Sequence, residues 1–157
     1  MTATIDIACD CEPSQCPDES VCKSWIEKTL HFLNEDADCN LSLRFLGVDE
    51  MAALNVQYRG KPGATNVLSF PSSAPRELAQ TIGFYPLGDI AICPPVLESE
   101  ALEQGKPLDA HWAHIIVHGL LHLYGYDHEK SEQASAMEAL EIEILKTLGI
   151  PNPYLVG

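Results

Sequence analysis

Three histidines in the last third of the sequence have a spacing that is typical of a metal site. His118 and His122 are four residues apart, so on a helix their side chains lie on one face, one turn apart. Gly125 can adopt the left-handed backbone conformation that ends a helix, and the returning chain can bring His128 to the same point. Three imidazoles that converge from one side leave other coordination positions open, as in catalytic zinc sites. The spacing therefore predicts that His118, His122 and His128 bind one Zn²⁺ or another divalent transition metal.

The same spacing, His-x3-His-x2-Gly-x2-His, is also that of the metzincin peptidases. In those enzymes a glutamate follows the first histidine and acts as the general base, whereas this chain has Gly119 at that position. A zinc peptidase is therefore an alternative that has its metal ligands but lacks its proton acceptor.

Length and charge limit the classes of protein that the chain can belong to. Its 157 residues are most simply one domain, 1–157, and the net charge of −14 argues against broad, sequence-independent binding of nucleic acid. Arg59 and Lys61 nevertheless fall together, and whole-chain charge does not decide the charge of one local site. No apolar run approaches the ~20 residues of a membrane span, and the N-terminus lacks the features of a signal peptide. We therefore expect a cytoplasmic protein with no membrane partner.

Cysteines are the second group of residues that could bind a metal, and six of them stand at positions 9, 11, 16, 22, 39 and 93. In a reducing cytosol these are expected to be free thiols. The spacing of Cys9, Cys11, Cys16 and Cys22 matches no zinc signature, and Cys9 is expected on a strand. The pattern disfavours a metal site there and leaves the role of these cysteines open.

The elements that position the histidines follow from apolar periodicity and from helix-breaking residues. Strands are expected over 4–8, 39–46, 67–70 and 88–93, and the last is apolar enough to lie inside the sheet. Helices are expected from a cap at Asp18 or Ser20 to about 33, from a cap at Asp49 to about 59, and over 94–105, 108–124 and 131–148, the last capped by Ser131. Residues 72–86 read as an irregular excursion. This order of elements predicts an α+β or mixed α/β domain.

The motif HGxxHLxGYDH at 118–128 resembles the signature of the YbeY family, bacterial metal-dependent endoribonucleases of ribosomal RNA maturation. The agreement extends to NxxYRG at 55–60, TxVLSFP at 65–71 and LGDI at 87–90, in family order. The resemblance covers most of the chain and is weakest over 1–46. The family usually has Asp where this chain has Asn66, and its pattern does not include the N-terminal cysteines.

The resemblance implies a function. It indicates a single-strand-specific endoribonuclease that acts in 16S rRNA 3′-end maturation and ribosome quality control. It implies zinc as the metal, His118, His122 and His128 as its ligands, and contacts with single-stranded RNA, ribosomal RNA and components of the small ribosomal subunit. It also implies a small mixed β-sheet of about four strands flanked by helices, with a central metal-binding helix. A non-catalytic ribosome-assembly factor with a structural metal is the remaining alternative.

Other residues are candidates for catalytic or binding roles. Arg59 is a candidate phosphate clamp, because its planar guanidinium matches phosphate oxygens, although an arginine at a helix end can also serve only the helix dipole. His114 lies one turn before His118 and could relay a proton, hold a phosphate or be a core histidine. Ser69 is a weaker candidate for phosphate binding. Asp127 could orient an imidazole or only brace the turn.

The nucleophile and the contacts with bases stay open at this level. Zinc held by imidazoles can lower the pKa of a coordinated water to about 7, which favours hydrolysis, while a route through the ribose 2′-hydroxyl is an alternative. Phe70 and Tyr126 could stack on unpaired bases, but core packing is the commoner role of such side chains.

Overall fold

A four-stranded mixed sheet is the centre of the computed structural model, which describes residues 1–127 and 129–155. The strand order is β1-β2-β4-β3, in which β1 (Ala3–Asp10), β2 (Cys39–Leu46) and β4 (Tyr85–Ile92) are parallel and β3 (Val67–Pro71) runs antiparallel to β4. The predicted α+β class and the predicted mixed sheet are confirmed. The prediction that 88–93 lies inside the sheet is also correct, since β4 is paired on both sides.

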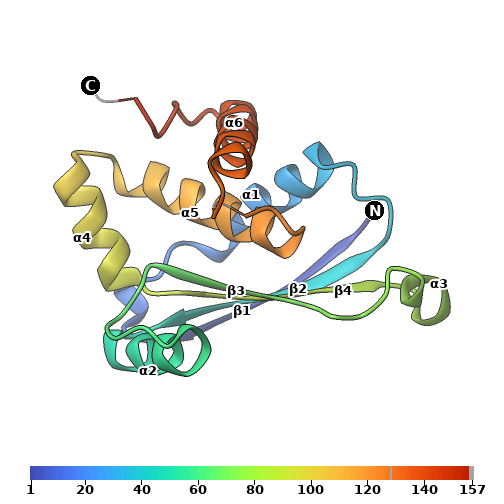
Figure 1. Ribbon diagram of the computed structural model, residues 1–157, viewed down its shortest axis with the longest axis horizontal. Coiled ribbons are helices and arrows are strands. Elements are labelled where there is room, and N and C mark those ends of the chain that lie inside the picture. Colours follow the sequence, from blue (N-terminus) through green and yellow to red (C-terminus); the bar gives the residue numbers. More distant parts are fainter. Residues whose placement is uncertain (128, 156–157) are drawn as a thin grey trace.

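Helices cover both faces of the sheet (Figure 1). On one face lie α1 (Glu19–Phe32), α5 (Leu108–Leu123) and α6 (Ser131–Thr147), and on the other face lies α2 (Val48–Arg59). The helix α4 (Pro94–Gln104) lies at one end of the sheet and the short α3 (Leu78–Ile82) at the opposite end. Among the described residues, no helix is long and apolar enough to cross a membrane.

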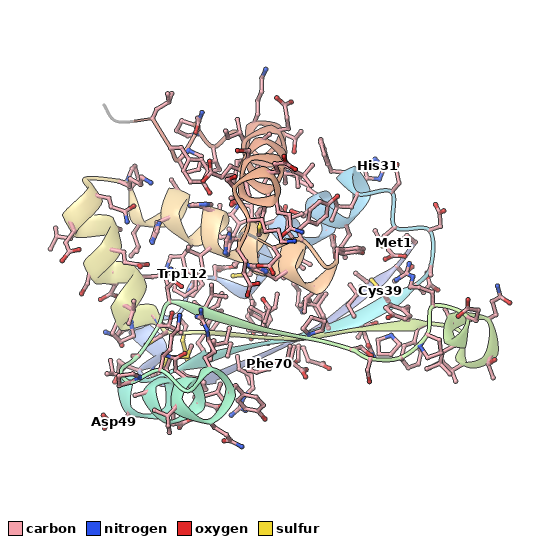
Figure 2. The ribbon with its side chains drawn as sticks, in the orientation of Figure 1. Met1, His31, Cys39, Asp49, Phe70 and Trp112 are labelled. Atoms are coloured by element: carbon pink, nitrogen blue, oxygen red, sulfur yellow. A yellow bond between two sulfur atoms is a disulfide. The ribbon has the colours of Figure 1, made fainter. Side chains whose placement is uncertain are left out.

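The main core lies between the sheet and the helices α1 and α5. Alternate residues of β2 are buried, as its pattern predicts: Leu41, Leu43 and Phe45 are at most 3% exposed. Trp112 of α5, labelled in Figure 2, meets the ring of Phe45 edge-on, with the ring centroids 5.3 Å apart. This packing fixes α5 on the sheet, and with it the orientation of the histidines along the helix.

The end of α5 has the geometry that the sequence predicts. Gly125 has φ +90°, a conformation that favours glycine, and its N–H donates to the carbonyl of His122 over 3.0 Å. The N–H of Tyr126 then donates to the carbonyl of Leu121 over 3.1 Å, so the chain turns back on the last turn of the helix.

Local signals predicted some boundaries and missed others. Asp18 caps α1, where its carboxylate accepts from the backbone N–H groups of Ser20 and Val21. The other two predicted caps are wrong, because α2 is preceded by Gly47 and α6 by Lys130, neither with a side-chain cap. The expected irregular stretch 72–86 contains α3 and the start of β4, elements too short or too mixed in polarity to show a clear period.

One prediction about the cysteines is wrong. Cys9 and Cys16 form a disulfide, while Cys11, Cys22, Cys39 and Cys93 are free thiols. The reason is a single 3-10 turn, Pro13–Gln15, which reverses the chain directly after β1 and brings Cys16 back beside the strand. The prolines predict a turn over 13–17, but nothing in the sequence indicates that this turn pairs Cys16 with Cys9.

Candidate functional site

Two of the three predicted ligands meet on the exposed side of α5. The Nε2 atoms of His118 and His122 face each other at 3.1 Å, and both imidazoles are partly exposed. Two ring nitrogens this close, each with lone-pair capacity, form the arrangement in which a shared cation is favoured. The third predicted ligand, His128, lies outside the described residues.

A buried carboxylate supports this pair from behind. Glu141 of α6 has no exposed surface, and its Oε1 lies 3.1 Å from Nδ1 of His118. The hydroxyl of Tyr154 donates to the same oxygen over 2.7 Å. When His118 donates its Nδ1–H to Glu141, its Nε2 keeps a lone pair that points toward His122, which is the tautomer that binds a metal.

The environment keeps Glu141 ionised. Burial pushes its pKa upward, but hydrogen bonds from His114 and His118 and the charges of these imidazoles outweigh burial and hold the pKa at about 2. Sequence reasoning missed Glu141, although one signal was available. It shares the apolar face of α6 with the buried Ile144 and Leu145, where an acidic residue needs a partner.

His114 belongs to this buried network. Its Nε2 lies 3.2 Å from the hydroxyl of Tyr154 and 3.4 Å from Oε2 of Glu141. Its ring centroid is 6.3 Å from that of His118. His114 lines a hollow of about 240 Å³ beside the C-terminal segment, on a different side from the cleft described next. The structure therefore places His114 behind His118, the predicted metal ligand.

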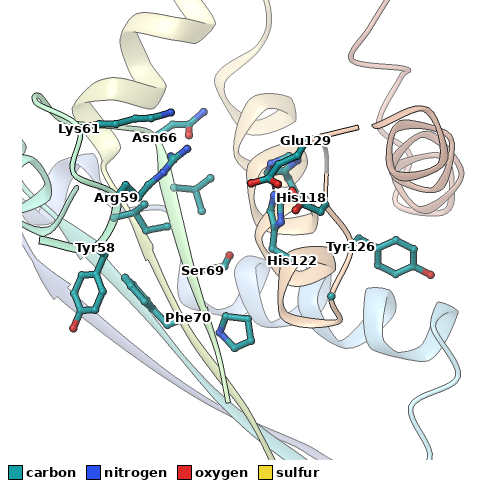
Figure 3. Close-up of a pocket in the computed structure, with 15 residues that line it drawn as sticks. Tyr58, Arg59, Lys61, Asn66, Ser69, Phe70, His118, His122, Tyr126 and Glu129 are labelled. Atoms are coloured by element: carbon teal, nitrogen blue, oxygen red, sulfur yellow. Dashed lines mark hydrogen bonds between the residues drawn. The ribbon is translucent and has the colours of Figure 1, made fainter. Parts of the chain in front are cut away.

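A cleft of about 830 Å³ opens in front of the histidine pair (Figure 3). Arg59 and Lys61, at and just beyond the end of α2, reach into it from one side, and His118 and His122 face them from the other. The predicted residues Ser69 and Asp127 also line it, together with Tyr58, Asn66, Phe70, Tyr126 and Glu129. The fold thus brings Arg59 into the same cleft as the predicted metal ligands.

The floor of the cleft is the contact between α5 and β3. The hydroxyl of Ser69 donates to the backbone carbonyl of Gly119 over 2.9 Å, so its proton is used to join the strand to the helix. A Cβ at position 119 would lie 3.2–3.3 Å from side-chain atoms of Ile90, Ser69 and Val67. Gly119 therefore faces the sheet at close range, and the position has no room for a glutamate.

Known proteins identify the family. A sequence model described as "Endoribonuclease YbeY" matches residues 8–149 of this chain. The chain belongs to the YbeY family. A relative named "Endoribonuclease YbeY" from Methylococcus capsulatus is 48% identical over 141 residues, which cover 90% of this chain and 89% of the relative. The solution structure of TM1509 from Thermotoga maritima has a similar fold, with a TM-score of 0.57 and 25% identity, covering 93% of this chain and 92% of that chain.

One departure from the usual YbeY pattern has a local explanation. The side-chain amide of Asn66 lies 3.3 Å from both carboxylate oxygens of Glu100, and Glu100 also pairs with Nε2 of His111 at 3.0 Å. Burial raises the pKa of Glu100, but hydrogen bonds from His111 and Asn66 reverse the shift and lower it. An aspartate at position 66 would put a second negative charge against Glu100. The neutral amide of Asn66 therefore avoids repulsion between two carboxylates and can donate to Glu100 instead.

Proposed function

We propose that this chain is a metal-dependent endoribonuclease that cuts single-stranded RNA, and that its substrate is the 3′ end of 16S rRNA during maturation and quality control of the small ribosomal subunit. The observation that carries the proposal is the 48% identity to a protein named Endoribonuclease YbeY over 90% of this chain. The matched region, 8–149, contains every residue of the cleft.

The histidine pair fits the metal that the family implies. His118 and His122 present Nε2 atoms 3.1 Å apart toward the cleft, and Glu141 fixes the tautomer of His118. With His128 as the third ligand, these side chains would hold one Zn²⁺ or a similar divalent ion. Such an ion supplies Lewis-acid chemistry, which polarises a phosphodiester oxygen and makes a water molecule more acidic.

The basic side of the cleft would bind the RNA backbone. Arg59 and Lys61 are exposed and lie across the cleft from the histidines. A guanidinium donates two parallel hydrogen bonds to a phosphate, so Arg59 would orient the scissile phosphodiester and stabilise its developing charge. This local basic edge explains how a chain with a net charge of −14 can approach RNA.

Aromatic side chains in the cleft favour an unpaired strand. Tyr126 is 39% exposed at the cleft. Phe70 also lines it and packs edge-on against Tyr58, with the ring centroids 4.7 Å apart. Bases stack on such rings only when they are not already stacked in a duplex. Single-strand specificity would follow from this lining.

The packing at Gly119 argues against the peptidase alternative. A general base at this position would have to replace a glycine that touches the sheet, and the structure offers no space for its side chain.

Contacts with components of the small ribosomal subunit are part of the proposal. They would present the 3′ end of the rRNA to a chain whose own basic surface is confined to one edge of the cleft.

Cleavage of a fluorescent single-stranded RNA tests the proposal, with the matching duplex as the competing substrate. We expect metal-dependent cleavage of the single strand, loss of bound metal in His118→Ala, and loss of activity with metal retained in Arg59→Ala. Arg44→Ala is the matched control, because Arg44 is an exposed arginine that pairs with Asp10 on the far edge of the sheet. Metal-dependent cleavage of casein with intact RNA would overturn the proposal.

The ends of the RNA products decide the nucleophile. A 5′ phosphate with a free 3′-hydroxyl would support water as the attacking group, whereas a 2′,3′-cyclic phosphate would support the ribose hydroxyl. Small subunits with an extended rRNA 3′ end are the substrate that tests the ribosomal part of the proposal. They should be trimmed faster than the same RNA free in solution.

A further inference from the structure

Three cysteine sulfurs meet at the edge of the sheet that lies farthest from the cleft. Cys9 is on the edge strand β1, Cys11 follows it, and the 3-10 turn Pro13–Gln15 returns Cys16 to the same place. Cys9 and Cys16 are joined in a disulfide. The free Sγ of Cys11 lies 3.6 Å from Sγ of Cys16 and 3.9 Å from Sγ of Cys9.

These separations are those of a thiolate metal site. Ligands at the usual Zn–S length of about 2.3 Å in a tetrahedron place neighbouring sulfurs about 3.8 Å apart. Both distances from Cys11 agree with this value, and the three sulfurs all lie within 4.8 Å of one another. The third pair of sulfurs, Cys9 and Cys16, is joined by the disulfide. Once that bond is reduced, these two sulfurs can move apart to the same spacing.

The surroundings favour a cation and are separate from the histidine pair. Burial, the largest cause, and the negative charges of Asp10, Glu12 and Glu50 raise the pKa of the Cys11 thiol. The same negative charges attract a positive ion. β1 and β3 are opposite edges of the sheet, and β3 forms the floor of the cleft. An ion at the cysteines would therefore not share ligands with His118 and His122.

The geometry points to a second metal site that is controlled by oxidation: when the Cys9–Cys16 disulfide is reduced, Cys9, Cys11 and Cys16 bind one thiophilic cation, Zn²⁺ or Cu⁺. Reduction takes two electrons and two protons from two molecules of a small thiol, which leave as their own disulfide. The cation then displaces the protons of the three thiols. In the reverse direction, an external disulfide accepts two electrons, the Cys9–Cys16 bond forms again and the cation leaves.

Soft thiolate ligands determine which ions can bind. Three sulfurs without a carboxylate ligand favour Zn²⁺ and Cu⁺ over Mg²⁺ or Ca²⁺. Their spacing along the sequence, Cys-x-Cys-x4-Cys, matches no zinc signature, which is why sequence reasoning disfavoured the site. The fold supplies the missing information, because one short turn replaces the loop that such signatures usually contain.

Co²⁺ titration of the reduced full-length chain, with the reductant removed under argon, tests this site. Cobalt–thiolate bonds absorb in the near ultraviolet, and cobalt at the histidines does not add to this band. We expect the band to reach full strength within two equivalents of cobalt in the reduced protein, since the histidines take up one ion without adding to the band, and we expect no band in the oxidised protein. Cys11→Ser removes one of the three sulfur ligands. It should weaken cobalt binding by at least about 10-fold, which is the loss found when only a hydrogen-bond partner of a metal ligand is removed. Cys22→Ala, which removes a buried thiol on α1, is the matched control and should keep the band.

Competition with cobalt then distinguishes Zn²⁺ from Cu⁺. The ion that removes the cobalt band at the lower free concentration binds the three cysteines more tightly. Circular dichroism checks that each variant is folded. A reduced wild type without the band would overturn the inference. So would a band of unchanged strength in Cys11→Ser, or one that persists after the Cys9–Cys16 disulfide has formed.

Discussion

Replacement of Glu141 by glutamine is the sharpest test of how this site is built. Glu141 is fully buried and accepts hydrogen bonds from Nδ1 of His118, at 3.1 Å, and from the hydroxyl of Tyr154, at 2.7 Å. Glutamine has nearly the same shape but no charge, and one of its two terminal atoms is a donor. That amide nitrogen would face a group that also donates, so at least one of the two hydrogen bonds is lost.

The size of the effect follows from these contacts. A hydrogen bond to a charged group contributes about 1.5–3 kcal/mol. Loss of the carboxylate also frees His118 to place its proton on Nε2, the atom that faces His122. We therefore expect Glu141→Gln to weaken zinc binding by about 10- to 100-fold, the range found for partners of metal-bound histidines.

A competition titration with a chromophoric chelator measures this affinity without any RNA. Glu143→Gln is the matched control, because it makes the same change at an exposed position of the same helix. Tyr154→Phe removes one donor to Glu141 and should have a smaller effect in the same direction. Zinc affinity in Glu141→Gln that equals that of Glu143→Gln would refute the supporting role of the carboxylate.

Three further predictions concern the cleft and the fold. Arg59→Ala should reduce kcat/KM for single-stranded RNA by about 100-fold or more, because it removes a preorganised hydrogen-bond donor to the phosphate. Steady-state kinetics measures this loss, and metal analysis should show an unchanged metal content. An unchanged kcat/KM would exclude this role. Burial opposes ionisation of Glu35, but hydrogen bonds from Arg76, Tyr124 and the backbone of Ala37, together with the charge of Arg76, outweigh burial and lower the pKa of Glu35 below its ordinary value of 4.5. A carboxylate with a lowered folded-state pKa stabilises the protein above its ordinary pKa and loses that contribution as the pH falls. Urea titrations should therefore show a free energy of unfolding that decreases below about pH 4.5, less steeply in Arg76→Ala; equal slopes would contradict the assignment. Gly88→Ala should lower this free energy by about 2–3 kcal/mol, because Gly88 has φ +137° and its Cβ would lie 2.2 Å from the carbonyl oxygen of Phe70; a melting temperature equal to that of the wild type would contradict it.

What the sequence could predict depended on the range of the interactions. The His118–His122 face and the turn at Gly125 are local properties of one helix and its end, and the structure agrees with both. The partnership of Glu141 with His118 spans two helices, and nothing in a single sequence pairs residues at that distance. Its only trace is an acidic side chain on an apolar helix face.

The cysteines show the opposite limit. Cys9, Cys11 and Cys16 are close in sequence, and the prolines predict a turn between them, yet that turn does not by itself show which two cysteines come into contact. Arg59 lies between these cases. Its place at a helix end was predictable, but only the packing of α2 and α5 on opposite faces of the sheet decides that it reaches the histidines' cleft.

The position of zinc in a crystal of the loaded protein, located by anomalous scattering, tests the proposed metal centre most directly. We predict one ion at about 2.0–2.1 Å from Nε2 of His118 and of His122, with His128 as the third ligand and a remaining position open to the cleft beside Arg59. An ion bound without His128, or one enclosed by a fourth protein ligand, would contradict this prediction.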